Sequence, residues 1–221
     1  MELKIKVPTE LSEITLAQYQ KYLKIVEANA NNSNTETFIS LKMLEIFCNV
    51  PYEQAVALKI KDVTHIVQIL ADMLNSKPEL VNRFKIGDVE FGFIPKLDDI
   101  SFGEYIDLDT YLGDWSKMEK AMAVLYRPIK NKSGERYLVH DYDPGKWDEA
   151  MKHTPMDAVI GSILFFYRLG IELSQAMMKY LAESEEMAIQ EVSNLQINGA
   201  GINQFTRSLK EMLDDLMILH E

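Results

Sequence analysis

The chain has very little cysteine: Cys48 is the single one among 221 residues, so no internal disulfide can form. Cys48 ends an apolar run that begins at Leu44, a setting typical of a buried thiol in a reducing compartment. The residues after Met1 include no apolar run of the kind found in signal peptides, so no secretory signal is expected.

Basic residues are also scarce, with 23 Lys and Arg against 34 Asp and Glu, a net charge of −11. Nucleic-acid binders need Lys and Arg to replace the counterions of the phosphates, so this composition argues against a nucleic-acid partner. It argues equally against an anionic membrane surface. Residues 86–119 carry nine acids and two bases, and residues 171–221 carry nine acids and three bases. These two acidic segments indicate basic partners or, more commonly, surfaces that keep the protein soluble.

No uncharged hydrophobic run is long enough to suggest a membrane span. The longest apolar stretch lies within 158–173 and is interrupted or flanked by Asp157, Arg168 and Glu172. Crossing a bilayer needs about 20 apolar residues, so a central helix of a globular core is the better prediction. Thr154 and Pro155 mark its start, as a helix cap followed by a first-turn proline.

Side chains suited to catalysis or metal binding do not group in any familiar pattern. Histidines are few and far apart, and only His140 to Asp143, with Glu149 and His153 downstream, gathers potential ligands. That spacing fits no zinc pattern, and 107–113 lacks the ligand and glycine positions of a calcium loop. We therefore expect no cofactor, no metal and no catalytic residue. The enzyme alternative is a hydrolase that uses the His140–Asp143 cluster.

The pattern of apolar residues predicts a mainly α protein with small β-hairpins. With 47% apolar residues, the chain can bury a sizeable core and is not expected to be disordered as a whole. We divide it into a helical region at 1–82, a hairpin and acidic–aromatic region at 83–153, and a long helix with a C-terminal amphipathic helix at 154–221. The three regions are expected to form one compact unit.

Local signals place the individual elements. Thr15 to Gln18 and Ser101 to Glu104 have the form of capping boxes, and each predicts a helix start. Asp62 is expected to cap another helix. Alternation around Gly87-Asp88 predicts a tight hairpin, and a second hairpin is expected with its tip at 131–134.

The segment 91–129 combines carboxylates with Tyr, Phe and Trp but has few nucleophiles. Such composition suits a protein-binding surface, where aromatic residues and Arg supply most of the binding energy. Arg127 is expected at a helix end, paired with Glu104, Asp107 or Asp109, or else solvated. The C-terminal helix 205–219 either packs on the body or docks on another copy or a partner. The candidate protein-binding residues are Phe91, Phe93, Phe102, Tyr105, Asp107, Asp109, Tyr111, Trp115 and Arg127, with Leu209, Met212, Leu213 and Leu216 of the C-terminal helix.

Some short motifs resemble bacteriophage proteins. The pattern from Ile5 to Gln20, a short strand followed by a capped helix, resembles proteins encoded among phage structural genes. The motifs 91–95, 102–107 and 122–128 are similar to a family found in phages of Bacteroidetes-like hosts. The small, acidic and mostly helical plan also resembles phage tail assembly chaperones. The resemblance implies a role in virion morphogenesis or virion structure and assigns no individual site residue.

The resulting functional prediction is a non-enzymatic phage virion assembly or structural protein, chaperone-like or a connector component. Its expected partners are other phage structural proteins or further copies of itself, with neither nucleic acid nor membrane. Its expected location is the host cytoplasm during assembly, with the virion as a second place. The alternative is an acidic phage inhibitor that binds a basic surface of a host protein.

Overall fold

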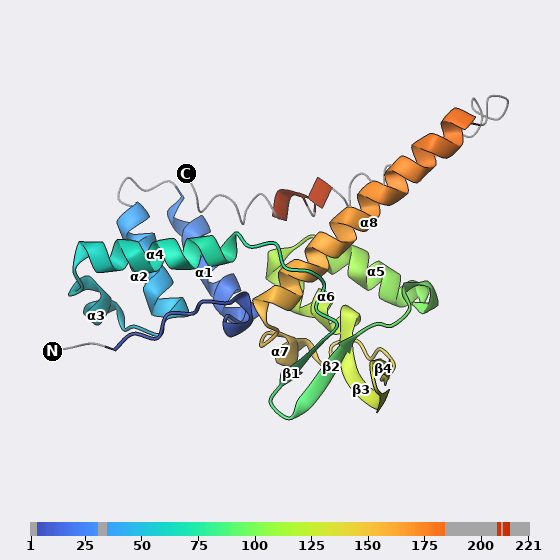
Figure 1. Cartoon of the computed structure of the whole chain (residues 1–221), viewed down its shortest axis with the longest axis horizontal. Helices are drawn as coiled ribbons and strands as arrows, with labels where there is room; N and C mark the ends of the chain where they lie inside the picture. Colours follow the sequence, from blue (N-terminus) through green and yellow to red (C-terminus); the bar gives the residue numbers. More distant parts are fainter. Residues whose placement is uncertain (1–3, 31–34, 184–206, 209, 213–221) are drawn as a thin grey trace.

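The computed structural model describes residues 4–30, 35–183, 207–208 and 210–212 (Figure 1). Helices dominate, and the strands form one small antiparallel sheet, which confirms the predicted mainly α fold with a minor β component. Within the described residues, no helix is long and apolar enough to cross a membrane.

The first region is a group of short helices at one end of the molecule (Figure 1). The predicted capping box at Thr15 is confirmed: the Gln18 amide donates to the threonine hydroxyl, and the Gln18 side chain accepts from the Thr15 amide. Asp62 lies in the first turn of its helix rather than at the cap, because the helix begins two residues earlier, at Ile60. The elements are η1 (Leu11–Glu13), α1 (Leu16–Asn29), α2 (Thr35–Phe47), α3 (Tyr52–Val56) and α4 (Ile60–Leu74).

The sheet is an antiparallel meander in the order β1-β2-β3-β4. Gly87 has a positive φ of 57° in the two-residue turn between the first pair, as the hairpin prediction requires. The second hairpin turns at Gly134-Glu135 and is tighter than predicted, because Asn131 already pairs with Leu138. The strands are β1 (Arg83–Ile86), β2 (Val89–Phe93), β3 (Tyr126–Ser133) and β4 (Arg136–Val139).

Glycine in β2 lets an aromatic ring lie across the sheet. A Cβ placed on Gly92 would stand 2.4 Å from the ring of Tyr137, so any side chain there would displace that ring. The Tyr137 hydroxyl donates to the carbonyl oxygens of Phe93, at 2.8 Å, and of Asn82, at 3.1 Å. The ring of β4 thus covers the bare backbone of β2 and fixes the register of the meander.

The remaining helices lie between β2 and β3 and after β4 in the chain. Helix α6 runs into β3 without a loop, since it ends at Leu125 and the strand begins at Tyr126. Arg127 therefore belongs to a strand, which corrects its predicted place at a helix end. The chain is already extended at Tyr126, whereas Pro128 disfavours the helical conformation of Arg127 alone. The elements are η2 (Leu97–Asp99), α5 (Phe102–Tyr111), η3 (Trp115–Lys117), α6 (Met118–Leu125), α7 (Asp148–Met151) and α8 (Met156–Glu183).

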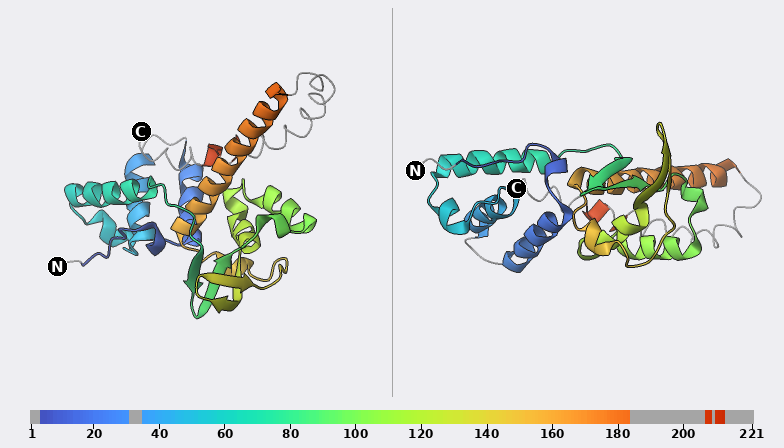
Figure 2. Two further views of the ribbon diagram at one scale, coloured as in Figure 1. Left: turned by 45° about the vertical axis from the view of Figure 1, so that its right-hand side comes forward. Right: turned by 90° about the horizontal axis from the view of Figure 1, so that it is seen from below.

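Helix α8 joins the regions and then extends beyond the body (Figures 1 and 2). At its start the Met156 amide donates to the carbonyl of Ile14, and the Leu16 amide donates to the carbonyl of Thr154, both at 2.9 Å. Gly161 lets the backbone of Glu79 cross α8, because a Cβ there would stand 2.5 Å from the Glu79 carbonyl oxygen. All three predicted regions contribute to a single buried apolar cluster.

Candidate protein-binding face

Helix α5 exposes large apolar side chains on one side. Phe102 is 78% exposed, Tyr105 54% and Ile106 46%. Their i, i+3 and i+4 spacing places them on the same face of the helix. On the other side Glu104 and Leu108 are buried. We call Phe102, Tyr105, Ile106 and the exposed Asp109 the α5 face.

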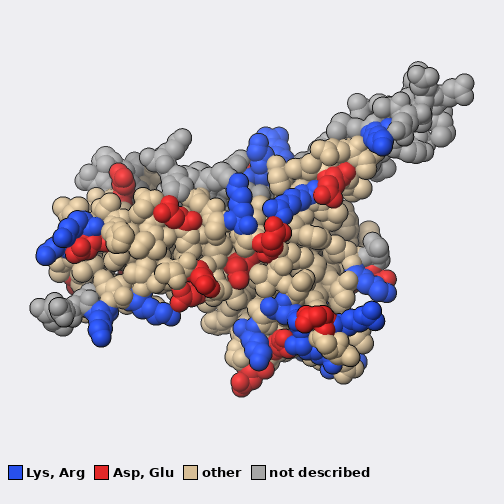
Figure 3. Space-filling view, viewed as in Figure 1, with Lys and Arg blue, Asp and Glu red and all other residues tan. Residues whose placement is uncertain are grey.

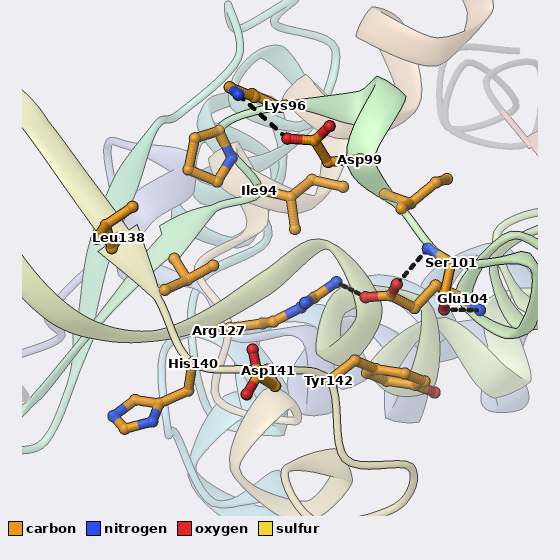
Figure 4. Close-up of a pocket in the computed structure, with 13 residues that line it drawn as sticks. Ile94, Lys96, Asp99, Ser101, Glu104, Arg127, Leu138, His140, Asp141 and Tyr142 are labelled. Atoms are coloured by element: carbon orange, nitrogen blue, oxygen red, sulfur yellow. Dashed lines mark hydrogen bonds and ion pairs between the residues drawn. The ribbon is translucent and has the colours of Figure 1, made fainter.

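A buried carboxylate fixes the start of α5. Glu104 accepts a hydrogen bond of 2.5 Å from the Ser101 amide, and its own amide donates to the Ser101 hydroxyl at 3.3 Å, which confirms the predicted capping box. Its second carboxylate oxygen pairs with the guanidinium of Arg127 from β3 (Figure 4). The predicted ion pair of Arg127 is therefore confirmed, with Glu104 as the partner.

The surroundings favour the charged form of this carboxylate. Burial raises the pKa of Glu104, but hydrogen bonds from Ser101 and the charge of Arg127 outweigh burial, so the pKa lies below its usual value. Arg127 is 8% exposed, and its Nε also donates to the Val124 carbonyl at 3.2 Å. That carbonyl belongs to the last turn of α6, where a cation is favourable.

A second link reaches α5 from the loop after β4. The Tyr142 hydroxyl donates to the Asp107 carboxylate at 2.8 Å. The Arg127 guanidinium carbon lies 5.5 Å from the centre of the Tyr142 ring, within the range of a cation–π contact. Burial, followed by the hydrogen bond to Asp107, raises the pKa of the Tyr142 hydroxyl. The two links hold α5 rigidly, so its exposed side is preorganised.

An open pocket of about 570 Å³ adjoins the start of α5. Apolar side chains line part of it, including Ile94, Ile100 and Leu138 (Figure 4). The exposed pair Lys96–Asp99 stands on its wall, with 3.2 Å between nitrogen and oxygen. The buried Glu104–Arg127 pair also lines the pocket, which therefore adjoins the buried side of α5.

Part of the His140–Asp143 cluster lines the pocket. His140 and Asp141 are exposed and line the pocket, whereas Asp143 pairs with Lys146 at 3.1 Å. In the described part of the chain, no group of three His, Cys, Asp or Glu side chains is placed to hold a metal ion.

Two of the candidate binding residues in the sheet are core residues, which corrects the sequence interpretation. Phe91 is 1% exposed and Phe93 is 6% exposed. Phe91 makes an edge contact with Trp147 beside α7, and Phe93 makes one with Phe165 of α8. Buried side chains cannot contact a partner in this conformation, so these two attach the sheet to the helices.

Two other candidates lie away from the α5 face. Tyr111 is half-buried, with the Lys120 ammonium 5.4 Å from its ring centre. Trp115 is half-buried against Tyr19, with 4.8 Å between ring centres. Ile106 was not among the predicted residues, although its i+4 spacing from Phe102 indicates that both lie on the same face of the helix. Leu138, 62% exposed at the pocket, was also missed, because its exposure depends on its edge position in the sheet.

The C-terminal candidates divide between described and undescribed residues. Met212 is 3% exposed and belongs to the apolar core. Nearby, a Cβ placed on Gly113 would stand 2.7 Å from the Ser208 hydroxyl, so this segment lies close against the connection after α5. Leu209, Leu213 and Leu216 lie outside the described residues. At Met212, the segment packs on the body.

Comparisons of this chain with protein-family models, curated proteins and solved structures found no match.

Proposed function

We propose that this protein acts without catalysis, through protein–protein contacts made by the α5 face, in the assembly or the structure of a bacteriophage virion. The observation that carries the proposal is the exposure of Phe102, Tyr105 and Ile106 side by side on a fixed helix. Aromatic side chains grouped on a rigid element are typical of the energetic centre of a protein interface.

Two properties of the α5 face favour binding: its apolar surface is exposed to water, and its helix is already held in place. Burying apolar surface is worth roughly 25 cal/mol per Å², so a partner that covers this face gains free energy. The contacts of Glu104 with Ser101 and Arg127 already hold the helix in place. Binding then costs little backbone ordering, which leaves more of the gain as affinity.

The phage assignment is supported by the sequence resemblance, which covers the segments around β2, α5 and α6. In this proposal the partners are other virion components or further copies of this chain, and the protein is a chaperone-like or connector component. It would meet them in the host cytoplasm during assembly, and in the virion if it stays in the particle.

Mass spectrometry of assembly intermediates and purified particles tests the proposal. A tagged wild-type chain should co-purify with virion components, and Phe102→Ala/Ile106→Ala should lose most of that material. Leu169→Ala/Leu173→Ala is the matched control, because these leucines are exposed on α8, 40% and 48%. Equal recovery with the α5 variant and wild type would contradict the proposal.

A second function is favoured by the acidity around the same face. Residues 97–111 contain five acids and no base. An inhibitor that occupies a basic surface of a host protein would use this charge, and its binding would weaken steeply with salt. Recovery of one host protein instead of virion components, with loss on Asp109→Lys, would favour this function.

A further inference from the structure

A second exposed apolar cluster lies at the junction of α3 and α4. Ile60 is 85% exposed and Val56 is 56% exposed. Ile60 and Phe102 are the two most exposed large apolar side chains among the described residues. Exposed lysines, Lys59 and Lys61, flank Ile60 in the chain. We call Val56, Lys59, Ile60 and Lys61 the α4 tip.

The α4 tip and the α5 face lie at opposite ends of the molecule. Figure 1 shows α3 and the start of α4 at the left end and α5 at the right, and both views of Figure 2 agree. The two surfaces therefore cannot cover each other within one chain. Each remains available to a different molecule.

The two surfaces differ in charge. Residues 51–62, around the α4 tip, carry two acids and two bases, so that end is neutral. In Figure 3 the left end indeed shows both blue and red side chains. Residues 97–111 carry five acids and no base, and Asp109 is exposed beside Tyr105 and Ile106. Glu104 pairs with Arg127 and Asp99 pairs with Lys96, so the exposed carboxylate on the α5 face is that of Asp109. The lysines next to Ile60 have the opposite charge to this carboxylate.

We infer that the partner of the α5 face is a second copy of this chain, which docks its α4 tip there. Ile60 of one molecule packs between Phe102 and Ile106 of the next, and Lys59 and Lys61 face the Asp109 carboxylate. The inference rests on the proposed function and names the partner. A symmetric contact of two α5 faces is disfavoured, because it brings like charges together.

A contact between two different surfaces is heterologous. Each molecule that uses its α5 face still has a free α4 tip, so association continues until a ring closes or an open filament grows. The contact is one helix turn against one helix face, smaller than the roughly 1,200–2,000 Å² of total buried surface in stable complexes. Each single contact is therefore weak, and association depends on protein concentration.

Sedimentation velocity of two variants tests this head-to-tail contact. Each variant, called end-blocked, has one of the two surfaces disrupted by an aspartate. The wild-type full-length chain should form species larger than a dimer as its concentration rises. Ile60→Asp and Phe102→Asp should each remain monomeric, since each lacks one of the two surfaces. An equimolar mixture of the two variants should give a heterodimer and nothing larger, because one competent tip and one competent face remain.

Charge variants provide the matched control. Lys59→Glu/Lys61→Glu should weaken association at least tenfold, and adding Asp109→Lys should restore part of it. Lys21→Glu/Lys24→Glu changes the charge equally at exposed positions on α1 and should leave association unchanged. Circular dichroism verifies that each variant is folded, and the substituted side chains are all exposed.

A wild-type chain that stays monomeric at all concentrations overturns the inference. Association that survives in Ile60→Asp also overturns it, because the contact then lies elsewhere. The inference is also overturned if the mixture of the two end-blocked variants stays monomeric. Capture of virion components that depends on Phe102 would still support the proposed function in each of these cases.

Discussion

The Tyr142 hydroxyl donates a hydrogen bond of 2.8 Å to the Asp107 carboxylate, so the loop after β4 holds the middle of α5. Arg127 holds the start of the same helix through Glu104. The exposed side of α5 is thus a rigid surface supported from the sheet and from the loop.

Tyr142→Phe should remove the link in the middle of α5 without leaving a cavity. We expect the free energy of unfolding to fall by about 1 kcal/mol, the usual net value of one hydrogen bond. Urea denaturation measures it. Tyr105→Phe is the control, because Tyr105 is 54% exposed. It should lower the free energy of unfolding by less. Equal losses in the two variants would show that the bond to Asp107 contributes nothing.

Arg127→Met should be among the most destabilising single changes. It leaves the buried Glu104 carboxylate without its cation, which typically costs about 3–5 kcal/mol of unfolding free energy. Lys96→Met breaks the exposed pair with Asp99 and should cost about 0–1 kcal/mol. Chemical denaturation of both variants compares a buried pair with an exposed one. Similar costs would contradict the account of the buried pair.

The stability of the protein should fall at acidic pH in a way that depends on Glu104. Its folded-state pKa lies below the usual glutamate value of 4.5, so the folded protein binds this proton less readily than the unfolded chain. The stabilisation is therefore complete above pH 4.5 and is lost as pH falls from there through the folded-state pKa. Melting temperatures of wild type and Glu104→Gln, compared across this range, should converge at low pH. A difference in melting temperature that does not change with pH would contradict this role of Glu104.

Two glycine substitutions should change stability in opposite directions. Gly92→Ala places a Cβ 2.4 Å from the Tyr137 ring and should cost about 1–3 kcal/mol through displacement of that ring. Gly103→Ala, in the first turn of α5, meets nothing nearer than 4.0 Å and should stabilise the protein by up to about 1 kcal/mol. Thermal denaturation distinguishes them, and a neutral Gly92→Ala would show that the ring moves freely.

Met212→Ala tests whether the C-terminal segment contributes to the core. Because Met212 is 3% exposed, its truncation should cost about 2–5 kcal/mol of unfolding free energy. Glu211→Ala, at an exposed neighbouring position, should cost much less. A Met212→Ala protein as stable as wild type, yet defective in partner capture, would instead make this segment an interface.

The sequence predicted best what depends on neighbouring residues. The capping boxes at Thr15 and Ser101 need only side chains three positions apart, and both are present. The roles of Phe91 and Phe93 were not predictable in this way, because alternation along a strand does not tell which side is covered. Trp147 and Phe165, far along the chain, cover them.

Arg127 illustrates a third case. Its charge and the nearby acids identified an ion pair, but the partner was left among three carboxylates. Which carboxylate pairs with Arg127 depends on the capping box, which turns Glu104 inward. Asp107 instead accepts a hydrogen bond from Tyr142, and Asp109 is exposed. The predicted helix end near Arg127 did not show that the chain becomes a strand at Tyr126.

The meander has two free edges, and their chemistry limits how copies of the protein can meet. Each edge strand has four residues, Arg83–Ile86 and Arg136–Val139, and both begin with a cation. Short, charged edges are a common protection against edge-to-edge pairing of sheets. Growth by adding strands, the route to amyloid-like aggregates, is therefore disfavoured, and ordered association is left to the helical surfaces.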